Sequence, residues 1–457
     1  MEQLTALDAG FLEAEDSDRH VSLAIGAVAV LDGPMPDADT VIATLAERAC
    51  SVPRLQHVLH TQPLDLAAPY WVQDNNFDAA HHIHRTALPR PGDDAALYRL
   101  LGDVMERRLD RDRPLWECWV VDGLQHGRWA ILMKVHHCVA DGIAATRLLR
   151  RLCDDPTDVP PESGKDSAPF RPLHWIAGAW RMSMDLLGAA IQAVRGVADI
   201  AAGLLRPAAA SSLIGSITSM RRYTSVAVPL DDVVSVCRAF GVTVNDVALA
   251  ALTDSYRSVL VGRGEKPQAN SLRTLVPVSV RSDGARDGTD NRVSVMLPYL
   301  PVDKADPVHQ LRTVHARLAR TKAGGQCLAG NALASAANVI PFPLAAWTVR
   351  ALTRLPQRGV VTVATNVPGP RKSLRFLGCK ASRLLPIPPL AMQLRTGVAI
   401  MSYADQLVFG VIGDYDAAPD VEELAAGIER AIARLAAISV GHWRSTPVGT
   451  LQLVQGG

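Results

Sequence analysis

The clearest hydrophobic pattern in the chain lies between residues 129 and 152. Residues 129–135 are apolar almost without interruption, and the run is short enough for a strand buried on both faces. Asp141 is a good N-cap for the segment that follows, where apolar residues recur with the spacing of a helix. The pattern predicts a buried strand, a turn and an amphipathic helix.

Shorter patterns of the same two kinds occupy much of the remaining chain. Strands are predicted at 21–31, 55–60, 70–73, 115–121, 274–280, 293–300, 360–364 and 407–412. Helices are predicted at 39–50, 94–109, 230–240, 247–260 and after Asp420. Gly241 closes the third of these helices, and Thr243 with Asp246 forms a capping-box pattern ahead of the fourth. Alternation of strands and helices predicts a layered α/β fold.

One stretch separates the chain into two parts. Residues 154–172 are rich in Pro, Asp and Ser and predict a linker. We therefore expect an N-terminal lobe at 1–155, a linker with an apolar helical segment at 156–220, and a C-terminal lobe at 221–457. The apolar segment 173–205 has two explanations, a helix packed on the domain junction or an interfacial element that enters a bilayer or oil droplet.

Composition excludes several classes of protein. Of the 457 residues, 48% are hydrophobic and 20% charged, and the net charge of +1 argues against nucleic-acid binding. Seven cysteines without a CxxC pair argue against a disulfide framework or a zinc ribbon. The acidic N-terminus lacks the features of a secretory signal, and no apolar run is long enough for a membrane span. We expect a cytoplasmic protein that can still contact a membrane peripherally.

The segment HHCVADG, residues 136–142, carries the candidate chemistry. Adjacent strand residues point to opposite faces, so His136 and His137 cannot act together on one substrate. An imidazole near its ordinary pKa is well suited to remove a proton at neutral pH, and we assign that role to His137 with His136 facing inward. Asp141 is expected to orient the loop through a hydrogen bond or a buried ion pair. Gly142 is expected to allow a tight turn beside a ligand.

Other reactive side chains have structural explanations. Cys138 lies inside the segment, but no base is assigned to activate its thiol. His81, His82 and His84 lack the convergent partners that a metal site requires, which favours a solvated loop or a strand edge. No metal is expected.

At this point a resemblance adds to the pattern. HHCVADG resembles the HHxxxDG signature of the acyltransferase superfamily that includes chloramphenicol acetyltransferase and peptide synthetase condensation domains. Further blocks resemble, in order, those of the bacterial wax ester synthase/diacylglycerol acyltransferases, above all the triacylglycerol synthase type. They are LTALDAGFL (4–12), PLWECWVVDGL (114–124), TVNDV (243–247), PVSVR (277–281) and TNVPGP (365–370). The resemblance spans nearly the whole chain.

The resemblance implies a fold and a substrate channel. It implies two lobes of the chloramphenicol acetyltransferase type, each a mixed sheet with helices, and an active-site tunnel between them. Pro114, Leu115 and Trp116 become candidates for shaping the channel, although spacing alone favours a buried strand and an Asp-Gly turn. Thr365 and Asn366 become candidates for a channel wall, although Pro and Gly beside them equally indicate a plain turn.

The resemblance also implies partners for the motif. Asn245 becomes a candidate to steady an oxyanion or to fix the histidine, whereas the sequence equally explains Asn245 and Asp246 as the start of a helix. An arginine of the second half becomes the candidate partner of the motif aspartate, and the sequence leaves Arg273 and Arg281 open. Asp246 is retained as a structural partner candidate.

The implied activity is transfer of a long-chain acyl group from acyl-coenzyme A to the free hydroxyl of diacylglycerol. Acyl-coenzyme A is a co-substrate, and no cofactor is expected. Residues 328–355, interrupted by Pro341 and Pro343, could form core or line an acyl chain. The alternatives are wax ester synthesis on a fatty alcohol, a condensation-type or polyketide-associated acyltransferase, and a non-catalytic lipid-binding protein. The expected location is the cytoplasmic side of the inner membrane or the surface of lipid inclusions.

Overall fold

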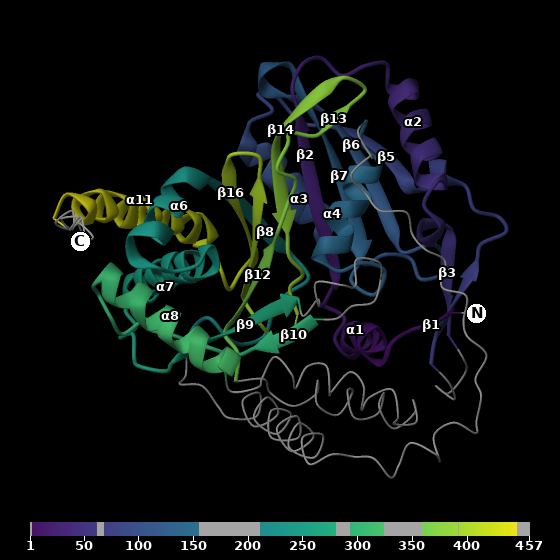
Figure 1. Ribbon diagram of the computed structural model, residues 1–457. Coiled ribbons are helices and arrows are strands. Elements are labelled where there is room, and N and C mark those ends of the chain that lie inside the picture. The colour runs from purple at the N-terminus through teal and green to yellow at the C-terminus, as the bar shows by residue number, and fades with distance from the viewer. Residues whose placement is uncertain are drawn as a thin grey trace, which may run out of the picture.

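Two large mixed sheets organise the molecule (Figure 1). The computed structural model describes residues 2–61, 68–154, 211–279, 293–323, 359–391 and 393–445. Within these ranges one sheet has six strands, another has seven, and a third has three. Both large sheets combine parallel and antiparallel pairs, which confirms the predicted α/β class with mixed sheets.

The first sheet is built mainly from the N-terminal part of the chain, in the order β13-β14-β2-β7-β6-β5. Its strands are β2 (Ala24–Leu31), β5 (Ile83–Ala87), β6 (Trp116–Leu124), β7 (Arg128–His136), β13 (Arg375–Phe376) and β14 (Cys379–Ile387). The helices of this lobe are α1 (Ala6–Ser17), α2 (Ala38–Cys50), α3 (Asp94–Glu106) and α4 (Gly142–Arg151). The small sheet joins β1 (Glu2–Gln3), β3 (His57–His60) and β4 (Tyr70–Gln73).

The second sheet follows the order β10-β9-β12-β15-β16-β8, with β11 paired to β9. Its strands are β8 (Arg221–Pro229), β9 (Leu272–Ser279), β10 (Val293–Met296), β11 (Tyr299–Leu300), β12 (Thr362–Val367), β15 (Thr396–Tyr403) and β16 (Gln406–Asp414). On the side away from the first sheet lie α6 (Leu230–Phe240), α7 (Val244–Gly262), α8 (Pro307–Ala323) and α11 (Val421–Ser445) (Figure 1).

Strand β7 lies between β2 and β6 and is antiparallel to both. Residues 129–136 of it are all buried, which confirms the strand predicted to be buried on both faces. Its charged residue Lys134 is buried because the ammonium donates to the carbonyls of Val104 (2.9 Å) and Arg107 (2.6 Å). These bonds satisfy carbonyls at the C-terminal end of α3, which ends at Glu106 and not at residue 109 as predicted.

A hairpin from the second half of the chain completes the first sheet. Strand β14 pairs antiparallel with β2, and in Figure 1 the green β14 stands beside the purple β2. Gly410 on β16 allows this arrangement, because a Cβ there would lie 1.8 Å from the carbonyl oxygen of Pro386 on β14. Tyr223 on β8 donates to that same carbonyl at 3.0 Å. The two sheets therefore meet along β14, and residues 375–387 belong to the sheet of the N-terminal half.

Local helix signals place several elements correctly. Gly241 adopts a left-handed conformation (φ 66°) at the end of α6, and Thr243 and Asp246 form the predicted capping box of α7. Two predicted strands are shorter or divided. Residues 53–56 form a turn of 3-10 helix, so β3 begins at His57, and the strand predicted at 293–300 is split into β10 and β11 around Pro298, which has no N–H to donate.

Several predicted segments lie outside the described residues. These are most of the linker at 154–172, the apolar segments 173–205 and 328–355, and Arg281. Among the helices that the structure describes, no single one has the length and apolar character to cross a membrane. Helices α6 and α7 meet that test only together, as a pair bent by 102°.

Candidate active site

The HHCVADG segment forms the turn between β7 and α4, and backbone bonds hold it on both sides. The N–H of His136 donates to the carbonyl of Leu115 on the β6 side (3.0 Å), and the N–H of His137 donates to that of Leu23 on the β2 side (3.0 Å). The two histidines are therefore fixed by the strands that flank β7. A site built on rigid strands keeps its geometry better than one on a free loop.

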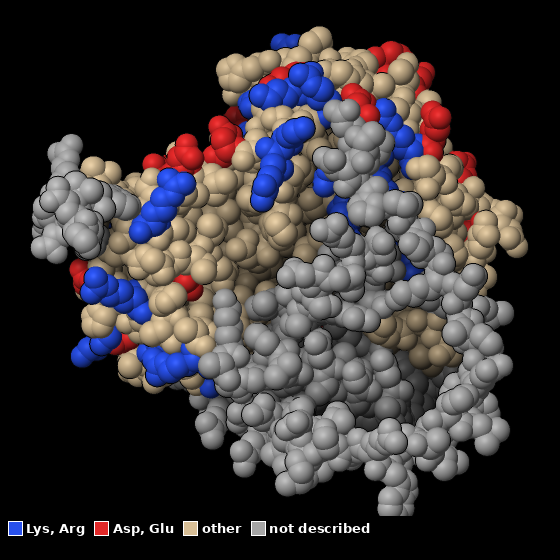
Figure 2. Space-filling view, in the orientation of Figure 1, with Lys and Arg blue, Asp and Glu red and all other residues tan. Residues whose placement is uncertain are grey.

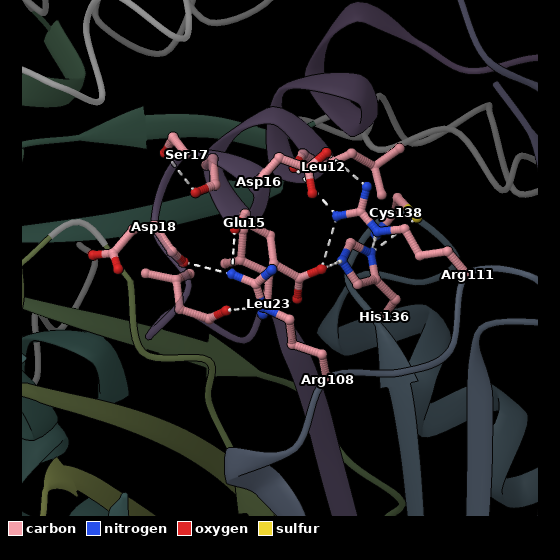
Figure 3. Close-up of polar contacts among 12 residues, drawn as sticks. Leu12, Glu15, Asp16, Ser17, Asp18, Leu23, Arg108, Arg111, His136 and Cys138 are labelled. Atoms are coloured by element: carbon pink, nitrogen blue, oxygen red, sulfur yellow. Dashed lines mark hydrogen bonds and ion pairs between the residues drawn. The ribbon is translucent and has the colours of Figure 1, made fainter. Parts of the chain in front are cut away.

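His136 points into the lobe. The residue is 1% exposed, its Nδ1 lies 2.9 Å from Sγ of Cys138, and its Nε2 lies 3.5 Å from Oε2 of Glu15 on α1 (Figure 3). Alternation along the strand thus places His136 inside, as the sequence predicts. Burial raises the pKa of the Cys138 thiol well above its usual value, so this cysteine is a poor nucleophile.

Glu15 is the charged partner that sequence reasoning missed. Its carboxylate receives the guanidinium of Arg111 (2.9 Å) and the N–H of Leu23 (3.0 Å), and the residue is 1% exposed (Figure 3). Burial alone would raise the pKa of Glu15, but His136, Arg111 and the Leu23 N–H together lower it to about 2. A carboxylate that stays charged inside the lobe therefore ties α1 to the histidine motif.

A sequence signal for α1 was present. Thr5 caps this helix by accepting a bond from the N–H of Asp8 (3.2 Å), and the Thr5–Asp8 spacing is that of a capping box. Reading that signal would have placed Glu15 on a helix. It would not have revealed that Glu15 faces His136, because only the tertiary fold brings the two together.

His137 is the next residue, outside β7, and its surroundings differ from those of His136. The residue as a whole is partly exposed but Nδ1 of its ring is buried, and the ring centroid lies 4.3 Å from that of Phe11 on α1. Burial lowers the pKa of His137 from 6.5 to about 4, although the charge of Asp141 opposes the shift. The expectation of an ordinary pKa was wrong, because the apolar surroundings disfavour the charged ring. The ring is neutral at pH 7 and can accept a proton.

Asp141 and Gly142 begin α4. The Oδ1 atom of Asp141 accepts the N–H of Ala144 at 2.7 Å, which confirms the predicted N-cap. Gly142 is not in the left-handed region. Its absent side chain instead permits close packing, since a Cβ there would lie 2.7 Å from Cγ2 of Val367 on β12. The start of α4 therefore touches the second sheet.

The second lobe brings two amides to this junction. Asn245 lies in the first turn of α7 and Asn366 on β12, and Nδ2 of Asn366 donates to Oδ1 of Asn245 at 3.5 Å. Thr365 lies beside them on β12, paired in register with Ala399. Asp246 is engaged in the α7 cap and lies 2.9 Å from Nδ1 of His315, which fits a structural partner.

A cavity of about 370 Å³ opens between α4 and the end of β12. Residues of α4 form one wall of this cavity, and residues at and after the end of β12 form the other. The lining residues are Ile143, Thr146, Arg147, Arg150, Asn366, Pro368, Gly369 and Pro370. Asn366 is shared with the amide pair, and Ile143 directly follows the HHCVADG segment, whereas His137 is not among the lining residues.

Other candidate residues lie in the core. Pro114, Leu115 and Trp116 are buried, and the indole N–H of Trp116 donates to the carbonyl of Leu55 at 2.8 Å. This is the buried strand that spacing alone favours, and a role in shaping a channel stays a prediction. Arg273 packs on the ring of Tyr299 (4.3 Å). The arginine partner of Asp141 also stays a prediction.

Two of the three histidines at positions 81, 82 and 84 lie beside tryptophan rings. His82 is buried, stacks on the ring of Trp116 (4.6 Å) and bonds its carbonyl (2.9 Å), so the prediction of a solvated residue was wrong for His82. His84 lies on the edge strand β5 beside Trp119. Within the described ranges no group of three or more His, Cys, Asp or Glu side chains is placed to hold a metal ion.

The chain is similar to known proteins over most of its length. The chain matches the wax ester synthase/diacylglycerol acyltransferase catalytic domain over residues 4–248 and the WS/DGAT C-terminal domain over residues 289–436. It is 53% identical to the diacylglycerol O-acyltransferase tgs1 of Mycobacterium tuberculosis, over 99% of this chain and 100% of that protein. The O-acyltransferase WSD of Acinetobacter baylyi is 26% identical, over 94% and 96% of the two chains. The solved wax ester synthase/diacylglycerol acyltransferase from Marinobacter aquaeolei VT8 superposes with a TM-score of 0.68 at 25% identity, covering 96% of this chain and all of that one.

Proposed function

This chain belongs to the wax ester synthase/diacylglycerol acyltransferase family, and from that premise we propose the reaction and its base. The enzyme transfers a long-chain acyl group from acyl-coenzyme A to the free hydroxyl of diacylglycerol, and the product is triacylglycerol. His137 is the general base. The observation that carries this assignment is a neutral imidazole on a rigid turn at the junction of two lobes.

The proposed chemistry needs one proton acceptor. His137 takes the hydroxyl proton as the alcohol oxygen attacks the thioester carbonyl, and a tetrahedral intermediate forms. The carbon–sulfur bond then breaks, and the imidazolium returns the proton to the departing thiolate, releasing free coenzyme A and the ester. No acyl-enzyme is required, in keeping with the raised pKa of Cys138. A general base typically contributes about 10²- to 10⁴-fold to the rate.

The second lobe supports the intermediate in this proposal. Asn245 lies at the N-terminal end of α7, where backbone N–H groups and the helix dipole give positive potential. An amide donor in that place suits the negative oxygen of a tetrahedral intermediate. Asn366 donates to the side-chain oxygen of Asn245. In this proposal the amide nitrogen of Asn245 is then available to donate to another group. The Asn366 contact therefore favours Asn245 as a donor to the reacting group.

The acceptor alcohol is the finer part of the proposal. The name of the Mycobacterium relative supports diacylglycerol, and the family name includes wax ester synthesis on a fatty alcohol. Both acceptors present one hydroxyl on an apolar body. Diacylglycerol resides in membranes and lipid inclusions, so the proposed enzyme works at the cytoplasmic surface of the inner membrane or of an inclusion.

The test is a reaction of purified protein with palmitoyl-coenzyme A and either diolein or hexadecanol, following free thiol and lipid products. We expect triacylglycerol and free coenzyme A in equal amounts, with diolein preferred. A condensation-type enzyme would instead need the acyl group on a carrier protein. Binding of acyl-coenzyme A by folded protein, without thiol release from either alcohol, would contradict the proposal and indicate a lipid-binding protein.

A further inference from the structure

We propose that Arg147 and Arg150 form a subsite for the phosphate groups of coenzyme A in the cavity between α4 and the end of β12. This inference rests on the proposed function, since it names where that reaction's acyl donor is held. The shared chemistry is recognition of phosphate by two guanidinium groups. Nothing in the reaction at His137 requires these arginines, so they can be tested separately.

The two arginines share one face of α4. They are three residues apart, which places them on neighbouring turns of the same helix surface. Both line the cavity and both are partly buried. Figure 2 shows basic side chains over the region of α4. Two arginines that line one cavity match a ligand that carries several phosphates.

The chemistry of the lining favours an anion. None of the described residues that line the cavity is acidic, and the polar ones besides the arginines are Thr146 and Asn366. A guanidinium binds phosphate through paired N–H donors, which a lysine cannot reproduce. Coenzyme A carries a diphosphate and a 3′-phosphate, whereas diacylglycerol carries no charge. Of the two substrates proposed, only the donor fits this lining.

The wall opposite the arginines is rigid. The N–H of Gly369 donates to Oγ of Ser402 (3.1 Å), and a Cβ on Gly369 would lie 2.0 Å from the Ser402 carbonyl oxygen. Pro368 and Pro370 flank this glycine, and the carbonyl of Pro370 accepts the N–H of Ala404 (3.0 Å). A fixed wall facing two arginines limits the ordering that binding would require.

The cavity lies along the helix that follows the proposed base. Arg150 is eight residues beyond Gly142, which corresponds to about 12 Å along the helix axis. The pantetheine arm of coenzyme A separates the thioester from the phosphates by an extended chain. A donor with its phosphates at Arg147 and Arg150 can therefore direct its thioester back along α4 toward the His137 turn.

The experiment compares Arg147→Ala, Arg150→Ala and the double variant with Arg151→Ala as the matched control. Arg151 lies on the same helix but does not line the cavity. Each enzyme is assayed with palmitoyl-coenzyme A and with palmitoyl-pantetheine, which lacks the phosphates, in neutral detergent without phospholipid. We expect KM for palmitoyl-coenzyme A to rise about tenfold for each arginine removed. KM for palmitoyl-pantetheine and kcat should be unchanged, and Arg151→Ala should resemble the wild type.

The outcomes separate the two proposals. A KM that is unchanged with palmitoyl-coenzyme A, or raised equally with both donors, would overturn the phosphate subsite. A wild type inactive with both donors would contradict the proposed function alone, and equilibrium binding of free coenzyme A would still test the arginines. If the double variant instead loses only binding to phosphatidylglycerol vesicles, the arginines recognise a lipid headgroup and the subsite is rejected.

Discussion

Glu15 and His136 meet inside the N-terminal lobe, with Oε2 of the carboxylate 3.5 Å from Nε2 of the ring. The contact joins α1 to the end of β7, and the guanidinium of Arg111 contacts the same carboxylate oxygen at 2.9 Å (Figure 3). The neighbouring His137 is thereby placed at the lobe junction by a buried, charged support. His136 ends β7 and the proposed base His137 follows it in the turn, so the proposed base and its buried support are separate side chains.

Replacing Glu15 should weaken this support. Glu15→Gln removes a buried charge from Arg111 and His136, and we expect a loss of about 3 kcal/mol in the free energy of unfolding at pH 7. The wild-type pKa is about 2 in the folded protein against 4.5 ordinarily. The charged carboxylate of Glu15 therefore contributes its full stabilisation of the folded protein above pH 4.5, and this stabilisation is lost as the pH falls toward 2. Urea unfolding across this range should show that dependence in the wild type and less of it in Glu15→Gln.

The control for Glu15 is Asp16→Asn. Asp16 is the second, half-exposed partner of Arg111, at 2.8 Å, and its removal leaves the contact with His136 intact. We expect a loss below about 1 kcal/mol for this exposed pair. Equal losses for the two variants would show that the buried contact adds nothing to stability.

Removing the proposed base should strongly reduce turnover without unfolding the protein. His137→Ala deletes the only group assigned to accept the hydroxyl proton, so kcat should fall by about 10²-fold or more. Circular dichroism and the melting temperature should stay near those of the wild type, because His136 and its support are unchanged. His84→Ala, on the edge strand β5, is the control and should remain active. Full activity of His137→Ala would refute the assignment.

The pH profile should reflect the lowered pKa of His137. Because the pKa is about 4 and not 6.5, the ring stays neutral as the pH falls from 7 to about 5. The acidic limb of kcat/KM, which reports the free enzyme, should therefore appear near pH 4. Each point requires a check that the protein is folded. An acidic limb near pH 6.5 would show that the free enzyme holds this ring in a more polar environment.

The sequence alone could predict the parts of the site that depend on neighbours in the chain. Strand β7, the Asp141 cap, the inward His136 and the capping box of α7 all follow from local spacing. Contacts between distant segments could not be predicted, because no local pattern encodes them. The Glu15–His136 pair, the Asn245–Asn366 pair and the insertion of β14 beside β2 are of this kind.

Burial also changed properties that residue type suggests. An imidazole on an exposed turn would keep an ordinary pKa, but packing against Phe11 and the lobe interior lowers that of His137. Lys134 would normally mark a solvated position, yet two carbonyls of the α3 terminus hold it in the core. Gly142 suggested a turn conformation, whereas its role is close contact with Val367. In each of these three cases, a residue from another helix or strand causes the difference from what the residue type alone suggests.

Asp141 combines a helix cap with a charge near His137, and two substitutions separate these roles. Asp141→Ala loses both and should cost about 1 kcal/mol of stability together with activity. Asp141→Asn keeps the cap but removes the charge that raises the pKa of His137, so stability should be nearly retained while the acidic limb moves to lower pH. Asp37→Ala, which removes the cap of α2, is the control and should lose stability alone. Identical pH profiles for Asp141→Asn and the wild type would contradict the electrostatic role.

Gly142 tests whether contact between the lobes matters for the reaction. A methyl group there would lie 2.7 Å from Cγ2 of Val367, and a β-branched valine has little freedom to move aside. Gly142→Ala should therefore cost about 1–3 kcal/mol, as overpacking does, and should lower kcat by shifting α4 from β12. Gly10→Ala on α1 is the control, since a methyl group there meets nothing within 4 Å, and it should instead stabilise the protein by about 0.4–1 kcal/mol.

Adding Val367→Ala to Gly142→Ala restores the space, so melting temperature and turnover should recover together. Recovery of stability without turnover would show that the contact supports the fold but does not position the histidine turn.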